Sequence, residues 1–275
     1  MTVRLPSIAI LGAGSMGGAI LTGLLGDGVE TDGITVTNRT EAKAAPLRAL
    51  GVTSLSIETD VDANRTALRG SRLVLLGVKP AMIPDLLRDV ADDLEPDAIV
   101  VSIAAGVTVA TMEALVSQVV FRSMPNTPST VRLGVTGVAA GTRATADDSA
   151  LVRSLFETVG AVVEVPESQI NALSTISGSG PAYVFYLIEQ LTLTAQKLGF
   201  DEAQARLMVE QTFRGASELL AASDVGPGEL RRRVTSPNGT TQRAVEVLEG
   251  ADLTTLFDRA AAAALARNDE MARGL

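Results

Sequence analysis

The sequence predicts a chain of two parts: an α/β domain built on a mostly parallel sheet, followed by an all-α domain. Three observations predict this arrangement. The 275 residues exceed the ~150 residues of an average domain. Short aliphatic runs alternate with helix-like segments up to residue 165, and after Pro166 only helical periodicity remains. We therefore place a first domain at residues 1–165 and a second at residues 166–275.

Short aliphatic runs bounded by turn residues predict the strands of the first domain, and the stretches between them predict its helices. Because strands and helices alternate, the strands are expected to run parallel. The predicted strands are Ile8–Leu11, Ile34–Asn38, Arg72–Val78, Ala98–Ser102, Val119–Arg122, Gly137–Gly141 and Ala161–Val165. The predicted helices are Gly14–Leu25, Glu41–Leu50, Ala81–Asp92, Val109–Leu115 and Asp147–Val159.

The second domain is predicted to contain helices only. Asp201 suits an N-cap and Pro181 a first helical position. The segment Tyr183–Leu193 is apolar almost all round, and in a domain of about 110 residues it needs more than its own chain for burial. This predicts a homodimer formed through the helices. The predicted helices are Glu167–Ser177, Pro181–Leu198, Asp201–Ala222, Gly228–Val234, Thr240–Leu248 and Thr254–Met271.

The composition excludes several kinds of chemistry. With no cysteine and no histidine, the chain forms no disulfide, no Cys- or His-ligated metal site, no thiolate nucleophile and no imidazole base. We therefore predict no metal site. Lysine occurs only at Lys43, Lys79 and Lys197. If the chain is an enzyme, a bound cofactor is expected to supply much of its chemistry.

The charge balance argues against nucleic-acid and membrane partners. Lys and Arg number 23 and Asp and Glu 32, so the net charge is −9, which repels nucleic acid and anionic lipid. The longest stretch without these residues, Ser168–Ile188, is long enough to span a bilayer but contains polar residues and Pro181. The apolar stretch Ser7–Leu25 contains a glycine motif that argues against a secretory signal. We expect a cytoplasmic protein with a small-molecule substrate.

A glycine motif follows the first predicted strand. Gly12, Gly14 and Gly17 form a G-x-G-x-x-G pattern at the mouth of a helix. This context is typical of Rossmann-like dinucleotide binding: the glycines allow a tight turn, close approach of a pyrophosphate and close helix packing. The helix N-terminus offers N–H donors to the phosphates. The alternative is a glycine-rich turn without a ligand. The predicted cofactor-binding residues here are Gly12, Ala13, Gly14, Ser15, Met16 and Gly17.

The end of the second predicted strand bears on the choice of cofactor. NAD-binding sites place Asp or Glu here to bind the ribose hydroxyls. This strand ends instead in Asn38, Arg39 and Thr40. The guanidinium of Arg39 can pair with a 2′-phosphate, and the neighbouring side chains can add hydrogen bonds. The pattern favours NADP(H), with NAD(H) at lower preference, although Arg39 as a solvated surface residue is the alternative.

Three later segments also follow predicted strands. Lys79 lies where ligands bind in such sheets, so contact with the cofactor is favoured over a lone solvated charge. Ala104 and Ala105 are small enough to let a flat ring lie close. The loop Arg122–Pro128 carries Asn126 between two prolines and indicates a rigid polar turn.

Two segments of the second domain are unusual for connections between helices. Ser177–Tyr183 and Val234–Thr241 are both rich in Gly, Ser and Thr, and both are expected to open a helix. Each is therefore a candidate anion site. Simple helix capping is the alternative for either one.

In their order and spacing, these segments resemble the pyrroline-5-carboxylate reductase family. The resemblance rests on Gly12–Gly17, Val78-Lys79-Pro80, Arg122–Pro128, Ser177–Tyr183 and Val234–Thr241, and it covers essentially the whole chain. It implies NADPH-dependent reduction of (S)-1-pyrroline-5-carboxylate to L-proline, the last step of proline biosynthesis. Asn238 stands where the family usually has glycine. Because Asn tolerates left-handed dihedrals better than most residues, we expect the turn to keep its geometry.

The resemblance also implies roles for single residues. Thr241 would hydrogen-bond the imine nitrogen and relay a proton from water, since a hydroxyl is too weak an acid to ionise by itself. The family forms dimers with intertwined helical domains, often assembled into a decamer. Family positions that contact the cofactor match Gly12–Gly17, Asn38, Arg39, Asn64, Val78, Lys79, Pro80 and Ala105, and those that contact substrate match Glu167, Gly239, Thr240 and Thr241.

Two other readings remain open at this stage. One is a different NADP-dependent imine or β-hydroxyacid reductase. The second domain offers only Lys197, late on its helix, as the basic lysine that hydroxyacid oxidation needs. The other is a non-catalytic dimer that senses NADP(H), which would bind nucleotide without turnover.

Overall fold

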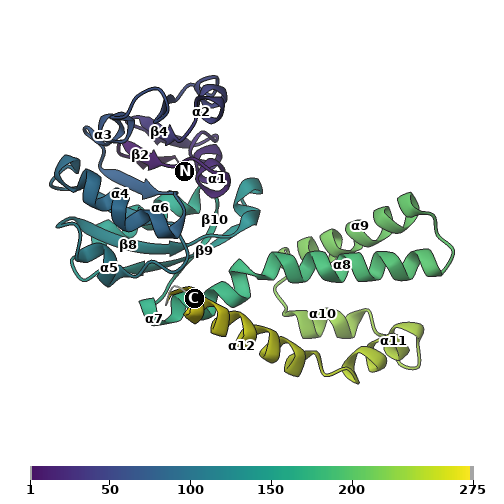
Figure 1. Cartoon of the computed structure of the whole chain (residues 1–275). Coiled ribbons are helices and arrows are strands. Elements are labelled where there is room, and N and C mark those ends of the chain that lie inside the picture. The colour runs from purple at the N-terminus through teal and green to yellow at the C-terminus, as the bar shows by residue number, and fades with distance from the viewer. Residues whose placement is uncertain (1, 273–275) are drawn as a thin grey trace. The chain divides into compact units, whose positions relative to one another are not determined.

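The computed structural model describes residues 2–272, which pack as two compact units (Figure 1). The first contains the residues up to Ser179 together with those from Leu265 onward, and the second is Gly180–Ala264. The last strand ends at Glu164, so the change from alternating strands to helices falls where the sequence predicts it. By packing, however, the first helical segment after that strand belongs with the sheet.

The first unit is built on one large sheet. Its strand order is β10-β9-β8-β7-β6-β2-β4-β5, and all neighbours are parallel except β8 and β9. All the predicted strands are present, and β2 and β4 have the predicted bounds. The strands are β2 (Ile8–Leu11), β4 (Ile34–Asn38), β5 (Thr53–Ser56), β6 (Leu73–Leu76), β7 (Ile99–Ser102), β8 (Val119–Met124), β9 (Gly134–Ala140) and β10 (Gly160–Glu164).

Helices cover both faces of this sheet because its strands bury both faces. Ile8 and Ile10 point to one face, where α1 and α6 pack, and Ala9 and Leu11 point to the other, where α3, α4 and α5 pack. The helices are α1 (Ser15–Leu24), α2 (Glu41–Arg48), α3 (Ala63–Leu68), α4 (Ile83–Val90), α5 (Val109–Glu113) and α6 (Ala146–Glu157), with short 3₁₀ helices at Pro80–Met82, Ala91–Asp93 and Thr127–Val131.

The strand order creates a crevice at the carboxyl edge of the sheet. The chain runs outward from β2 through β4 to β5 and then returns to β6 on the other side of β2. Connections therefore leave β2 and β6 in opposite directions, which opens the edge between them. This is where the glycine loop after β2 and the segment after β6 meet.

Four short elements were not predicted. They are β1 (Val3–Leu5) and β3 (Val29–Thr31), which pair in a small parallel sheet of their own, together with β5 and α3. Strand β5 reads Thr-Ser-Leu-Ser and lacks an aliphatic run. Helix α3 has only six residues, too short to show a period.

The segment Ser177–Tyr183 corrects a prediction. Helix α7 (Glu167–Leu173) continues directly into a π-helix, Ser174–Gly178, and α8 (Gly180–Lys197) begins two residues later. The N–H of Ser179 donates to the carbonyl of Ser174 at 2.9 Å. Helix α8 begins inside this segment, as predicted, but the preceding helical turns run almost directly into it, so the prediction of an anion site at its start is wrong.

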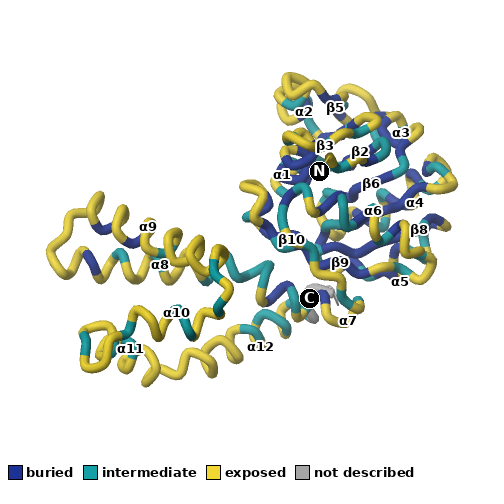
Figure 2. Tube along the Cα trace, turned by 180° about the vertical axis from the view of Figure 1, so that it is seen from behind, coloured by how far each residue is buried: buried dark blue, intermediate teal, exposed yellow. Residues whose placement is uncertain are grey.

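The second unit consists of helices, as predicted. Asp201 is the N-cap of α9 and forms a capping box with Gln204. Most of its large apolar side chains are exposed in the single chain, and Figure 2 colours these helices mainly as exposed. Within residues 2–272, no helix has the length and apolar character needed to cross a bilayer. Besides α8, the helices are α9 (Glu202–Ala221), α10 (Pro227–Arg233), α11 (Thr240–Glu249) and α12 (Leu253–Ala272), whose last turns pack in the first unit.

Candidate active site

The glycine loop after β2 has the geometry that dinucleotide binding requires. Gly12 has a φ of +94°, and a Cβ there would lie 2.9 Å from Val78 Cγ1. A Cβ at Gly17 would lie 2.8 Å from the Gly12 carbonyl oxygen, so α1 packs against the turn itself. At Gly14 no protein atom lies within 4 Å of a Cβ position. Protein packing therefore does not require glycine at position 14. The close approach of a dinucleotide pyrophosphate to the protein backbone would require it.

The start of α1 is open to an anion. Gly14 is its N-cap and contributes no side-chain hydrogen bond, and the first turn contains no acidic residue. The first N–H groups of a helix have no partner within the helix and carry partial positive charge. A phosphate group fits this end of α1.

The end of β4 gathers the predicted polar residues. The Thr37 hydroxyl donates to Asn64 Oδ1 at 2.8 Å, which brings α3 to the same edge. Asn38 is 3% exposed and its Nδ2 has no hydrogen-bond partner, and the same holds for the hydroxyl of Ser56, its neighbour on β5. Buried polar groups are normally paired. These unpaired groups fit an edge that completes its hydrogen bonds with a ligand.

Arg39 and Thr40 lead from this strand into α2. Arg39 is exposed, and no carboxylate within residues 2–272 forms an ion pair with it. Thr40 is the N-cap of α2 without a side-chain hydrogen bond. The end of β4 itself carries no carboxylate, but the neighbouring strand supplies one. Glu58, two residues after β5, accepts the N–H of Glu41 at 2.9 Å. Sequence reasoning missed Glu58 because it missed β5.

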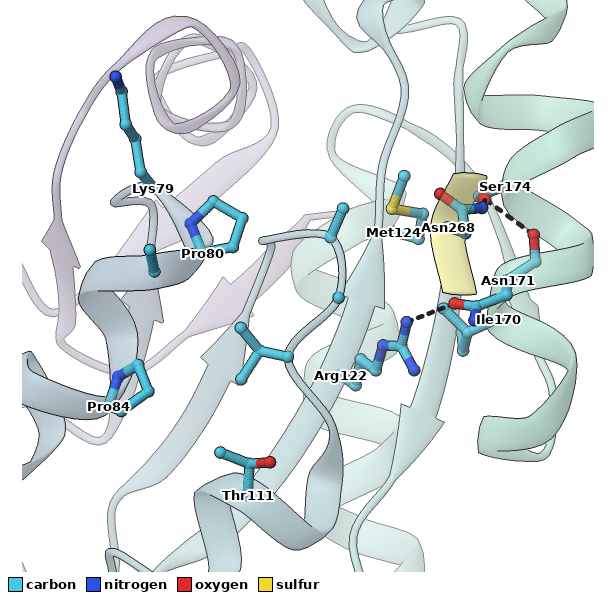
Figure 3. A pocket seen from close by; sticks show the side chains of 14 residues that line it. Lys79, Pro80, Pro84, Thr111, Arg122, Met124, Ile170, Asn171, Ser174 and Asn268 are labelled. Carbon is cyan, nitrogen blue, oxygen red and sulfur yellow. Dashed lines mark hydrogen bonds between the residues drawn. The ribbon is translucent and has the colours of Figure 1, made fainter. Parts of the chain in front are cut away.

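A cavity of about 630 Å³ lies at the ends of β6, β7 and β8 (Figure 3). Lys79, Pro80 and Ala105, three of the residues predicted to contact the cofactor, line it. Ala104 is buried beside them, and its N–H donates to the Ser102 hydroxyl oxygen at 3.3 Å. The remaining lining residues are Ala81, Pro84, Gly106, Val107, Thr111, Arg122, Met124, Ile170, Asn171, Ser174 and Asn268.

Arg122 is the buried cation of this cavity. Its side chain is 7% exposed at the end of β8, and its Nη2 donates to Asn171 Oδ1 at 2.7 Å, as drawn in Figure 3. Its Nη1 lies 3.4 Å from Glu167 Oε1. The same oxygen accepts the N–H of Val109, the first residue of α5, at 2.7 Å. Arg122 thus holds α7 against the end of β8, and Glu167 holds it against the start of α5.

Arg122 and Asn171 were not among the predicted site residues. The available signal was an arginine in an otherwise apolar strand, since a buried arginine needs partners. Asn126, in the loop that follows, is buried and structural: it accepts the Val135 N–H at 2.8 Å and donates to the Ser177 carbonyl at 2.9 Å. The loop is polar and fixed, as predicted.

The predicted substrate loop lies in the second unit. Gly239 is the N-cap of α11, and Thr240 and Thr241 are its first two residues, with no acidic residue in the first turn. The Gly239 N–H already donates to the Ser236 carbonyl at 2.9 Å. Of the three residues expected to contact substrate here, Gly239 therefore has its N–H already bonded, and the donors left for an anion are those of Thr240 and Thr241.

Asn238 keeps the turn geometry, as expected. Its φ is +61°, in the left-handed region, and its N–H donates to Gln242 Oε1 at 2.7 Å. The predicted cofactor-binding residues, Glu167 and Arg122 thus all belong to the first unit. The loop with Thr240 and Thr241 belongs to the other compact unit.

The fold and the glycine loop at the sheet's switch point define a Rossmann-like dinucleotide-binding protein with a helical second domain. Two family models match the chain. Residues 7–106 match "NADP oxidoreductase coenzyme F420-dependent", and residues 167–271 match "Pyrroline-5-carboxylate reductase dimerisation".

Full-length relatives agree with these matches. A pyrroline-5-carboxylate reductase of Pseudomonas aeruginosa is 37% identical over 273 residues, which cover 98% of both chains. The structure of a pyrroline-5-carboxylate reductase from Coxiella burnetii is 37% identical, with a TM-score of 0.89 over 96% of this chain and 97% of that one. The enzyme of Plasmodium falciparum, solved with NADP bound, shares the fold at 23% identity, with a TM-score of 0.81 over 97% and 98% of the two chains. The chain belongs to the pyrroline-5-carboxylate reductase family.

Proposed function

We propose that this chain reduces (S)-1-pyrroline-5-carboxylate to L-proline with NADPH, the last step of proline biosynthesis. The observation that carries the proposal is the full-length family membership of a chain whose glycine loop is open at Gly14. We retain residues 1–165 as the dinucleotide-binding domain and 166–275 as the helical dimerisation and substrate domain.

NADP(H) is the proposed cofactor, and NAD(H) binds at lower preference. Gly12–Gly17 and the start of α1 hold the pyrophosphate, and Arg39 pairs with the 2′-phosphate. The 2′-phosphate role of Arg39 is supported by its exposed guanidinium, which has no ion-pair partner within residues 2–272. Asn38, Thr40 and Asn64 complete the ribose end, and Val78, Lys79, Pro80, Ala104 and Ala105 line the path to the cavity.

The reduced nicotinamide supplies a hydride for the imine carbon when the cofactor is bound. The chain's own residues bind and orient the substrate. The N–H groups of Thr240 and Thr241 receive the carboxylate at the start of α11. The Thr241 hydroxyl donates to the ring nitrogen and relays a proton from water, and Glu167 contacts the substrate from α7.

This assignment explains how a chain with net charge −9 takes an anionic substrate. Backbone dipoles at a helix start attract a carboxylate without a cationic surface. The cavity adds the positive charges of Arg122 and Lys79. Much of the rate then comes from holding the imine close to the nicotinamide in a reactive geometry.

We propose that the protein acts in the cytoplasm as a homodimer with intertwined helical domains, which assembles further into a decamer. The match of residues 167–271 to a dimerisation family supports the dimer. The exposed apolar side chains of α8 support it as well: Phe185 is 65% exposed and Tyr186 61%. In the dimer, each active site combines a nucleotide domain with helices of both subunits.

The test is the loss of reduced-nicotinamide absorbance with pyrroline-5-carboxylate, run in parallel with NADPH and NADH. We expect formation of proline, with NADPH preferred. Turnover with NADH preferred would keep the reaction and refute the role of Arg39. Tight NADPH binding without turnover would refute the proposed reaction.

A further inference from the structure

One carboxylate stands at the place where the 2′-phosphate of NADP(H) is proposed to bind. Glu58 follows β5 and reaches the start of α2, where its Oε2 accepts the N–H of Glu41. The Glu58 N–H donates to the carbonyl oxygen of Arg39 at 3.1 Å. The backbone thus ties Glu58 directly to the arginine that is proposed to bind the phosphate.

The charges at this edge are not neutralised by one another. The carboxylate of Glu41 pairs with Arg48 inside α2. Glu58 and Arg39 form no ion pair with each other, nor with any other charged side chain of residues 2–272. The unpaired carboxylate of Glu58 and the unpaired guanidinium of Arg39 therefore belong to residues that follow neighbouring strand ends.

A second observation shows that this edge is prepared for a ligand. Asn38 and Ser56 end β4 and β5 side by side in register, and both carry a buried polar atom without a hydrogen-bond partner. Arg39 and Glu58 follow these two residues closely in the chain. The unpaired buried groups and the unpaired charges belong to one end of the crevice.

The two charges select opposite cofactors. A guanidinium favours the 2′-phosphate, whereas a carboxylate repels it and accepts hydrogen bonds from the 2′- and 3′-hydroxyls of a bare ribose. A phosphate arriving at the start of α2 would also compete with Glu58 for the N–H donors there. Glu58 therefore weakens the binding of a 2′-phosphate that Arg39 strengthens.

We propose that Glu58 is a specificity-determining residue that lowers the preference for NADPH over NADH and lets the enzyme use both. This inference rests on the proposed cofactor site and deepens it. Removal of the Glu58 charge makes the site more selective for the phosphorylated cofactor.

The test compares Glu58→Gln with the wild type. Glutamine keeps an oxygen for the Glu41 N–H and removes only the charge. Glu95→Gln is the matched control, because Glu95 also accepts a backbone N–H, that of Gly70 at 2.8 Å. Gly70 and Glu95 precede strands β6 and β7, at the amino ends of the strands and away from the proposed cofactor site. Each protein is titrated with 2′,5′-ADP and 5′-ADP by calorimetry, and kcat/KM is measured with NADPH and NADH.

We expect Glu58→Gln to raise the ratio of kcat/KM for NADPH over NADH about 5-fold or more, as expected for removal of one like charge at a partly screened site. The affinity ratio of 2′,5′-ADP over 5′-ADP should rise in the same direction, and Glu95→Gln should leave both ratios within about 2-fold. The increase should shrink at high salt.

An unchanged ratio in Glu58→Gln, or equal changes with both nucleotides, would overturn the inference and leave Glu58 as a helix cap only. The binding arm needs no turnover, so it remains decisive if the proposed reaction fails. If the wild type binds neither nucleotide, the cofactor site is refuted and the inference with it.

Discussion

Alanine substitutions at three neighbouring glycines, Gly14, Gly17 and Gly18, should have three different outcomes. All three lie within the glycine loop and the first turn of α1. An added methyl group would meet a backbone atom at Gly17, whereas at Gly14 and Gly18 it would meet no protein atom within 4 Å, and of these two only Gly14 lies where the pyrophosphate is proposed to bind. Comparing them separates the needs of packing from the needs of cofactor binding.

Gly17→Ala should destabilise the protein. The new Cβ would lie 2.8 Å from the Gly12 carbonyl oxygen and 3.4 Å from Ile10 Cγ2, and the first of these atoms is backbone in a tight turn. Overpacking costs about 1–3 kcal/mol, and a clash with a backbone atom belongs in the upper half of that range, at about 2–3 kcal/mol. The gain in helix propensity returns about 1 kcal/mol. The net loss of about 1–2 kcal/mol corresponds to a Tm lower by about 2–8 °C.

Gly18→Ala should stabilise it. No atom lies within 4 Å of a Cβ at this position, which is inside α1. The substitution gains about 0.5–1 kcal/mol of helix propensity without a clash.

Gly14→Ala should affect binding instead of stability. A Cβ at Gly14 also meets no protein atom within 4 Å. Alanine is a poorer N-cap than glycine by up to about 1 kcal/mol, so the Tm without cofactor should fall less than in Gly17→Ala. The methyl group would meet the pyrophosphate, and we expect NADPH affinity to fall about 10-fold or more, or about 1.4 kcal/mol.

Thermal unfolding without cofactor and NADPH titration by fluorescence measure both effects on all three variants. A Gly17→Ala protein as stable as the wild type would refute the packing argument. A Gly14→Ala protein with wild-type NADPH affinity would refute the position of the pyrophosphate.

Three further predictions concern other residues. Thr241→Ala should lower kcat/KM for the imine about 10-fold or more with NADPH affinity unchanged, as for loss of one positioned hydrogen bond, and unchanged kinetics would remove Thr241 from the site. Arg122→Met should lower stability by about 2–3 kcal/mol, because Asn171 Oδ1 loses its donor and the part-exposed Glu167 loses its charge partner while keeping the Val109 N–H. Arg153→Met on the surface should cost under about 1 kcal/mol, and equal unfolding midpoints of the two variants in denaturant would contradict this. Burial raises the pKa of Asp148, but hydrogen bonds from Thr145 and the charge of Arg72 outweigh it and hold the pKa below its ordinary value. The stabilisation from this carboxylate is therefore complete at neutral pH and is lost as the pH falls from about 5 through the folded-state pKa, so Asp148→Asn should lower the Tm at pH 7 and weaken its acid dependence.

Long apolar or periodic segments were predictable from the sequence. Strands β2 and β4 begin and end where the sequence predicts, and the tight turn predicted at the glycine motif is present, with a φ of +94° at Gly12. The start of α9 was predictable from Asp201, because its side chain caps the helix through a bond to a residue three positions away. In each case the cause lies within a few residues of the chain.

The missed features depend on contacts distant in the sequence. Strand β5 carries small polar side chains and exists because it pairs with β4. Glu58 reaches α2 only because β5 ends beside β4, and Arg122 meets Asn171 across 49 residues of chain. The composition of the Ser-Gly-Ser-Gly-Pro stretch indicates a helix start after a loop. In the structure the π-helix Ser174–Gly178 replaces that loop, and only Ser179 separates it from α8.

The sparse interior of the second unit has a consequence for folding. In Gly180–Ala264 the buried apolar residues of the single chain are Ala195, Ala205 and Val209. Such a unit buries too little surface to offset the entropy of ordering its helices, so it folds only as it associates. Its melting temperature should therefore rise with protein concentration, whereas that of the sheet unit should not. Dilution would then inactivate the enzyme by melting one unit and leaving the nucleotide-binding fold intact.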